Sequence, residues 1–104
     1  MKLPAEVDVS NAEQVRDTLL AVLNQGISTL VIDMTQTSYC AAAGVSAVVR
    51  AYQRAQASGA AIRVVAPAPM VRRVLTVGRV DRVIPVFPAL AEALEATGES
   101  AVNA

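Results

Sequence analysis

The sequence predicts an α/β fold in which a small, mostly parallel sheet is covered by about four helices. Two observations support this fold class. Short β-branched segments alternate along the chain with longer segments whose apolar residues recur at helical spacing. The hydrophobic share of 54% is typical of a chain that folds around a core. The length of 104 residues is enough for one such core and too short for two. We therefore expect a single domain.

The first part of the chain predicts an extended segment, a helix and a strand. Ser10, followed three residues later by Glu13, fits a capping box after the extended segment 3–9. The helix would end at 24–26 and bury one stripe of apolar residues: Ala12, Val15, Leu19, Val22 and Leu23. The β-branched run 29–34 is typical of a strand buried on both faces.

A second helix and a second strand are expected next. The helix would follow Gly44 and stop at Ser58 and Gly59, with an inward stripe of Val45, Val48, Val49, Tyr52 and Ala55. The segment 61–66 is again β-branched and apolar, which predicts a strand.

The last part of the chain predicts two further helices around a short strand. Pro67 and Pro69 open a helix that would bury Met70, Val71, Val74 and Leu75 and expose Arg72 and Arg73. The strand 83–86 contains a proline, which indicates a sheet edge. A final helix would begin at Pro88 and bury Leu90, Ala91 and Leu94, and residues 98–104 would form a frayed tail.

Composition excludes several functions. Nine Lys and Arg balance nine Asp and Glu, so the chain has no excess positive charge for binding the phosphates of a nucleic acid. Aromatic residues make up 3%, so few side chains are available to stack on bases. Without histidine, and with Cys40 as the single cysteine, a zinc site has almost no ligands to draw on and a histidine-dependent triad has no base. No apolar run is long enough to span a membrane, and the acidic start is unlike a signal peptide, so we expect a cytoplasmic location.

The sequence is also poorly equipped for catalysis. The five glycines are widely spaced, so no phosphate-binding loop is present and no cofactor is expected. The acids Glu6, Asp8, Asp33 and Asp81 could pair for acid–base work or Mg²⁺, although solvated strand ends are commoner. Cys40 could be activated at a helix start, but its small apolar neighbours favour a buried thiol.

The segment 39–49 is unusual because residues with almost no side chain join a strand to a helix. A helix start prefers Ser, Thr, Asp or Asn as its N-cap, and losing such a cap costs about 1 kcal/mol. Here the expected cap position holds alanine, whereas the first helix has a polar start. Local rules tend to fail at functional sites or where a functional residue has been removed, so this segment is the candidate site. Tight packing under the helix is the alternative explanation.

At this point nearly the whole chain resembles one family. Leu3–Asp8 with Ser10, Leu30–Met34, Gly44–Ala47 and the stretch from Ala66 to Val83 are similar in order and spacing to STAS domains of bacterial anti-sigma factor antagonists. The resemblance implies a STAS-type fold, a single domain over residues 1–97 and a non-enzymatic regulator. This chain departs from the family pattern at its start, because the family commonly has a strand before the segment that resembles residues 3–8. If that strand is missing, the bare sheet edge would invite homodimerisation.

The family's loop motif, Asp-Ser-(Ser, Thr or Ala)-Gly, aligns without gaps to Ala41–Gly44. The resemblance places the phosphorylated serine at Ala42 and the aspartate at Ala41, so this chain lacks both side chains, whether by nature or by engineering. It implies binding to an anti-sigma factor of the serine kinase type, which then releases its sigma factor. With Ala42 the chain would stay in the unphosphorylated, binding-competent form. The expected contact residues are Ser10, Asn11, Cys40, Ala41, Ala42, Ala43, Gly44, Ser46, Ala47 and Arg50.

Three alternatives share this fold, and one of them is a degenerate STAS domain that serves only as a scaffold. A STAS accessory subunit of an ABC-type lipid transporter would dock on the transporter's ATPase and needs no phosphorylatable serine, which Ala42 mildly favours. A nucleotide-binding STAS protein is less favoured, because the phosphate-binding loop is absent.

Overall fold

The computed structural model describes residues 1–95 and confirms the α/β fold class. Along the chain lie β1 (Glu6–Val7), α1 (Ala12–Leu23), β2 (Thr29–Asp33), β3 (Tyr39–Cys40), α2 (Ala42–Ser58), β4 (Ala61–Val65), α3 (Pro69–Val77), the 3₁₀ helix η1 (Val80–Arg82) and β5 (Val86–Phe87). Residues 90–95 are helical. The expected tail 98–104 lies outside the described residues.

All strand pairs within residues 1–95 are parallel, as expected. One sheet has the order β2-β4-β5, with Thr29 opposite Ala61 and Val64 opposite Val86. β1 pairs with β3 in a separate two-stranded sheet. β5 is an edge strand, as expected, but it comprises Val86–Phe87 rather than 83–86, because the N–H groups of Val83 and Ile84 donate to the Val80 carbonyl at 3.1 and 2.8 Å.

The chain's own start covers the sheet edge beside β2. Lys2 forms a parallel bridge with Asp33, where the Leu3 N–H donates to the Asp33 carbonyl at 2.8 Å and the Asp33 N–H donates to the Met1 carbonyl at 2.7 Å. Further along this outer edge, Pro4 has no N–H, and the Glu6 carbonyl accepts a bond from the Asn11 side chain at 2.8 Å. The homodimer was predicted on the condition that the sheet edge beside β2 is unpaired. Residues 1–3 pair with this end of β2, so the condition is not met there.

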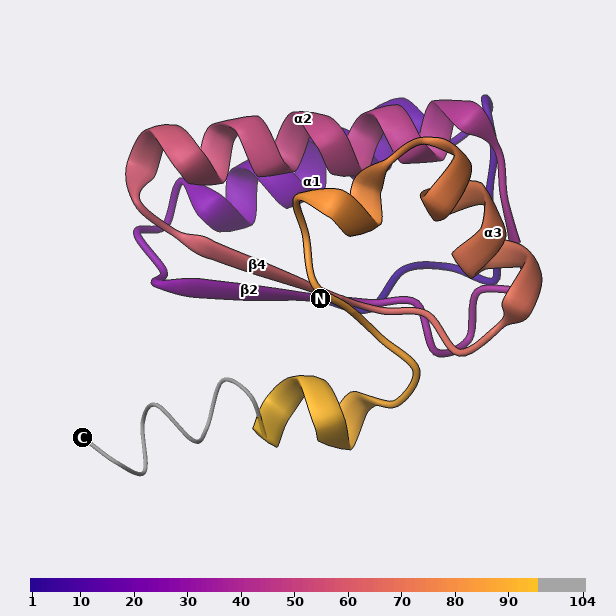
Figure 1. Ribbon diagram of the computed structural model, residues 1–104. Coiled ribbons are helices and arrows are strands. Elements are labelled where there is room, and N and C mark those ends of the chain that lie inside the picture. The colour runs from indigo at the N-terminus through magenta and orange to yellow at the C-terminus, as the bar shows by residue number, and fades with distance from the viewer. Residues whose placement is uncertain (96–104) are drawn as a thin grey trace.

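Helices are distributed unequally over the two faces of the sheet. α1, α2 and α3 lie on one side, and the helix at 90–95 lies on the other (Figure 1). Accordingly, Leu30 and Ile32 of β2 are buried, whereas Thr29 and Val31 are half-buried. The prediction that this strand is buried on both faces was therefore wrong.

Three predictions about individual side chains were also wrong. α1 begins at Ala12, without a side-chain cap, because the Ser10 hydroxyl binds Asp8 rather than the helix. Met70 is exposed because it lies on the side of α3 turned away from buried Val71 and Leu75. In the last helix Ala93 is buried, whereas Ala91 and Leu94 are exposed.

Candidate functional site

The candidate loop is the direct junction between β3 and α2. β3 ends at Cys40, Ala41 is the N-cap with extended backbone (φ −82°, ψ 168°), and α2 starts at Ala42. No side chain caps the helix; the Ala41 carbonyl accepts the N–H groups of Gly44 and Val45 at 2.9 and 3.2 Å. The uncapped start that the sequence indicated is therefore present.

Close packing beneath this junction explains its small residues. A Cβ atom on Gly44 would lie 2.7 Å from Cys40 Sγ and 2.7 Å from Val7 Cγ1, so only glycine fits. Cys40 is 2% exposed, and burial raises the pKa of its thiol, which therefore stays protonated. Cys40 is thus a core residue, in agreement with the buried-thiol interpretation.

The predicted contact residues divide into exposed and buried groups. Ala42, Ser46 and Arg50 are exposed and follow one another at intervals of four along α2, so they share one side of the helix. Ala41 and Ala43 are half-buried. Cys40, Gly44 and Ala47 are buried, so they could support a contact only by shaping the surface above them.

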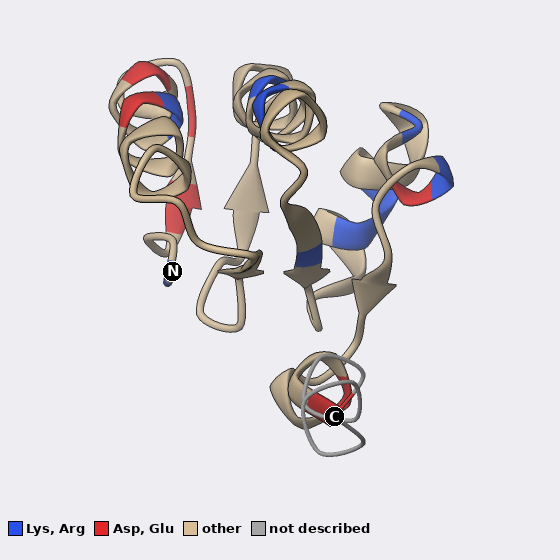
Figure 2. Ribbon diagram, turned by 90° about the vertical axis from the view of Figure 1, so that its left-hand side faces the viewer, with Lys and Arg blue, Asp and Glu red and all other residues tan. Residues whose placement is uncertain are grey.

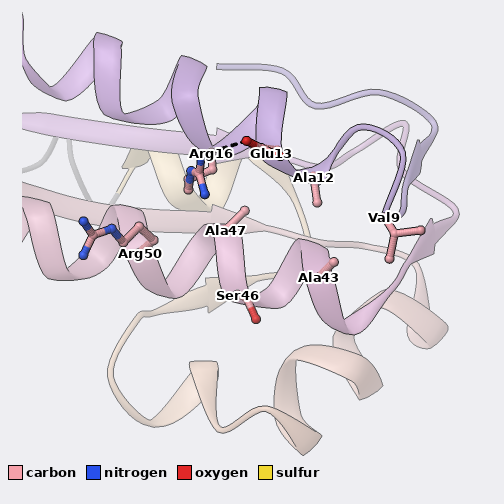
Figure 3. A pocket seen from close by; sticks show the side chains of 8 residues that line it. All are labelled: Val9, Ala12, Glu13, Arg16, Ala43, Ser46, Ala47 and Arg50. Carbon is pink, nitrogen blue, oxygen red and sulfur yellow. Dashed lines mark ion pairs between the residues drawn. The ribbon is translucent and has the colours of Figure 1, made fainter.

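A hollow of about 480 Å³ lies between α1 and α2 beside the loop (Figure 3). We call it the α1–α2 groove. α2 contributes Ala43, Ser46, Ala47 and Arg50 to its lining, and the other wall is formed by Val9, Ala12, Glu13 and Arg16. This second wall was not predicted from the sequence. Its available signal was Val9, an apolar residue in a polar turn that is 82% exposed.

Ser10 and Asn11 shape the turn that carries Val9. Asp8 Oδ1 accepts bonds from the N–H and the hydroxyl of Ser10, which hold the pKa of Asp8 below its usual value. Asn11 Oδ1 accepts the Asp8 N–H at 2.9 Å, and its Nδ2 donates to the Glu6 carbonyl at 2.8 Å. These two predicted residues are therefore outside the groove lining and support its rim.

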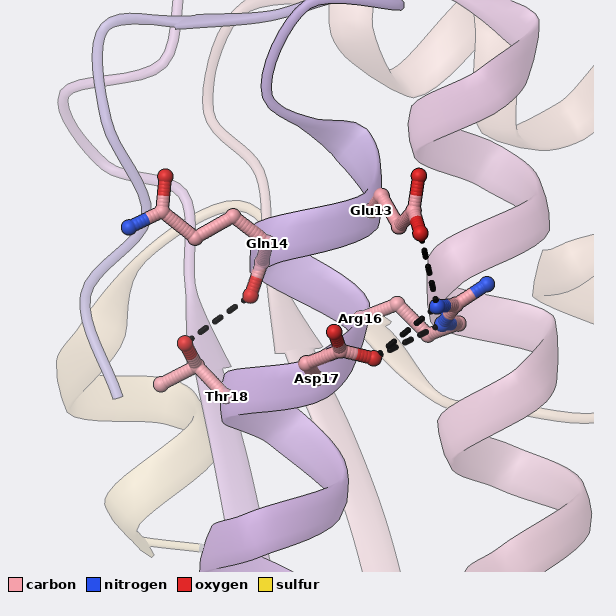
Figure 4. Close-up of polar contacts among 5 residues, drawn as sticks. All are labelled: Glu13, Gln14, Arg16, Asp17 and Thr18. Atoms are coloured by element: carbon pink, nitrogen blue, oxygen red, sulfur yellow. Dashed lines mark hydrogen bonds and ion pairs between the residues drawn. The ribbon is translucent and has the colours of Figure 1, made fainter.

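Two arginines of the α1–α2 groove differ in their electrostatic state. Arg16 Nη2 lies 3.0 Å from Asp17 Oδ1 and 3.6 Å from Glu13 Oε1 (Figure 4), so its charge is largely balanced. In the same helix the Thr18 hydroxyl donates to the Gln14 carbonyl at 2.9 Å. Arg50 forms no ion pair with any residue in 1–95. An exposed, uncompensated guanidinium therefore lies on the same side of α2 as Ala42, eight residues further along the helix.

The acids considered for catalysis do not form a metal site. Within residues 1–95, no group of three or more His, Cys, Asp or Glu could hold a metal ion. Burial acts to raise the pKa of Asp33, but the Thr35 hydrogen bonds and the positive charges of Lys2 and the N-terminal amine outweigh it and lower that pKa. Asp33 is thus an ionised strand-end carboxylate.

The chain belongs to the STAS-domain family, whose family model matches residues 1–93. Its fold is similar to that of an anti-sigma factor antagonist from Mycobacterium paratuberculosis, with 25% identity over 91% of this chain and 80% of the other, and a TM-score of 0.83. A STAS-domain antagonist protein from Planctomyces limnophilus is also 25% identical, over 90% and 84% of the two chains, with a TM-score of 0.78.

The antagonist SpoIIAA in its unphosphorylated form has the same fold, with a TM-score of 0.78 and 20% identity over 94% of this chain and 85% of its own. Among curated proteins, none matches the sequence of this chain. None of the helices within residues 1–95 is both long and apolar enough to cross a membrane.

Proposed function

We propose that this protein is an anti-sigma factor antagonist that binds an anti-sigma factor of the serine kinase type and so frees a sigma factor. The observation that carries the proposal is the position of Ala42, exposed in the first turn of α2 beside the α1–α2 groove, in a STAS domain whose structural neighbours include antagonists. The protein acts by binding, in the cytoplasm, without an enzymatic activity of its own.

Ala42 is proposed to occupy the phosphoacceptor position. In a serine-containing relative, phosphorylation there would add nearly two negative charges to a surface that must lose its water on binding, and so would disrupt the complex. Alanine has no hydroxyl to phosphorylate. The protein is therefore fixed in the form that binds, and Ala41, Ala42 and Ala43 present a neutral surface to the partner.

The contact is proposed to continue from this loop along α2 over Ser46 and Arg50, with Val9 at the opposite rim. Val9 supplies apolar area, and Arg50 supplies a charge without an internal partner. Ser10 and Asn11 act indirectly by holding the turn that carries Val9. The chain's own start pairs with the edge of β2 on which a homodimer was expected, so this edge does not favour dimerisation.

Binding to two purified candidates from the same genome tests this proposal. One is a serine-kinase-type anti-sigma factor, and the other is the ATPase of an ABC-type lipid transporter, the partner of the alternative accessory subunit. We expect a saturable complex with the anti-sigma factor alone, which α1–α2 groove variants weaken. A complex with the ATPase alone would replace the regulator by the accessory subunit.

A further inference from the structure

The surface formed by α3 and η1 concentrates positive charge. Residues 69–83 contain four of the nine Lys and Arg residues and a single acid, Asp81, which gives this segment a net charge of +3 in a chain whose net charge is zero. The segment lies on the opposite side of the molecule from the acidic β1 and α1 (Figure 2). Its cations are all exposed, and none forms an ion pair with a residue in 1–95: Arg72, Arg73, Arg79 and Arg82.

The same surface also exposes apolar side chains. Six large hydrophobic residues are exposed within residues 1–95, and three of them lie here: Met70 (59%), Val77 (79%) and Val83 (51%). Met70, Arg73 and Val77 are at positions i, i+3 and i+7 of α3, so they share one side of the helix. We call this combination of cationic and apolar side chains the α3–η1 face.

The α3–η1 face packs on α2, and one of its arginines has an unfavourable backbone conformation. A Cβ atom on Gly78 would lie 2.6 Å from Val45 Cγ1, so the end of α3 packs directly on the first turns of α2. The next residue, Arg79, has a positive φ of 62°, a conformation that glycine adopts far more readily. An arginine at this position makes the folded backbone less favourable than a glycine would.

We propose that the α3–η1 face is a second protein-docking surface, which binds a segment of another protein that carries acidic side chains among apolar ones. Uncompensated arginines attract and orient carboxylates, and the exposed Met70 and Val77 supply area that is desolvated on contact. A membrane-binding helix would instead have a continuous apolar face anchored by aromatic residues. In α3, cationic Arg73 lies between the apolar residues, and the nine-residue helix contains no aromatic residue.

Site-specific cross-linking in cells tests this proposal on the full chain. A photoreactive benzoylphenylalanine replaces Val77, whose exposure allows the larger side chain. We expect a cross-link to a protein segment rich in Asp and Glu, as identified by mass spectrometry. Arg73→Glu should lower the yield on the order of tenfold, because it places like charges opposite each other. Arg72→Glu serves as a second charge reversal, and Lys2→Glu, at the distant N-terminal edge, should leave the yield unchanged.

Several results would overturn the proposal: no cross-link, a cross-link only to lipid, a cross-link to a second copy of this chain or to a basic segment, or a yield that neither charge reversal lowers. Thermal unfolding of each variant verifies that it is folded. The same photoreactive residue in place of Ala42 reports separately on the proposed function. If that probe fails to reach an anti-sigma factor, the proposed function is wrong, whereas the result at Val77 still decides the role of the α3–η1 face.

Discussion

Gly44 lies so close to Val7 that a Cβ atom on the glycine would be 2.7 Å from Val7 Cγ1. The first turn of α2 therefore packs closely against Val7 of β1, the strand that precedes the turn and helix of the other groove wall. The α1–α2 groove depends on this approach, because its two walls belong to these two parts of the chain.

Gly44→Ala is therefore expected to destabilise the protein by about 1–3 kcal/mol, since neither buried Val7 nor buried Cys40 can move aside freely. Urea unfolding measures the change. The sign is diagnostic, because glycine-to-alanine within a helix ordinarily stabilises by about 0.5–1 kcal/mol. A more stable Gly44→Ala variant would contradict the close packing.

Ala41→Asp is expected to stabilise the protein by about 1 kcal/mol. Ala41 already has the extended backbone of an N-cap, and α2 has no side-chain cap, so the new carboxylate can accept a free N–H of the first turn. The free energy of unfolding measures this effect, with Ala57→Asp near the opposite end of α2 as the control. An equal gain from both substitutions would argue against capping.

Arg50→Glu is expected to weaken binding to the anti-sigma factor by about tenfold at low salt and by less at high salt, since the partner would face a reversed charge. Titration calorimetry at two salt concentrations measures both effects. Lys2→Glu makes the same charge change at the N-terminal edge and should be neutral. If the two variants bind alike, Arg50 lies outside the contact.

Cys40 is expected to react with a thiol reagent about 100-fold or more slowly in the folded than in the unfolded protein, because the raised pKa and the burial both suppress attack by the thiolate. In the unfolded protein the thiol has its ordinary pKa of about 8.5, which is lower than its pKa in the folded protein. Cys40 therefore stabilises the fold fully below about pH 8.5, and this contribution declines as the pH rises further. Cys40→Ala should remove this alkaline decline. A slope that persists in the variant would assign it to another group.

The sequence predicted the helices and strands that have strong periodicity. α2 and the paired strands β2 and β4 lie within a few residues of their expected positions, because their apolar patterns coincide with their burial. Ser10 was misassigned because Asp8, two residues earlier, binds both its N–H and its hydroxyl. That competition depends on the turn geometry, which a motif of two residues does not specify.

The candidate site was predictable on one side only. The alanines at the start of α2 marked the loop, because they depart from the usual N-cap residues. The wall formed by Val9 and Arg16 had only one weak signal, an apolar residue in a polar turn, since the wall results from the packing of α1 against α2. Met70 was expected to be buried because its apolar character fits a core stripe, whereas the rotation of α3 turns it outward.

The most direct test of the central claim measures the affinity of the purified anti-sigma factor for this chain and for an Ala41→Asp, Ala42→Ser version, each with and without ATP. We expect both versions to bind without ATP, ATP to release the serine version alone, and this chain to remain bound and unmodified. Release of this chain by ATP, with phosphate on Ser38 or Ser46, would contradict the claim that Ala42 fixes the protein in its binding form.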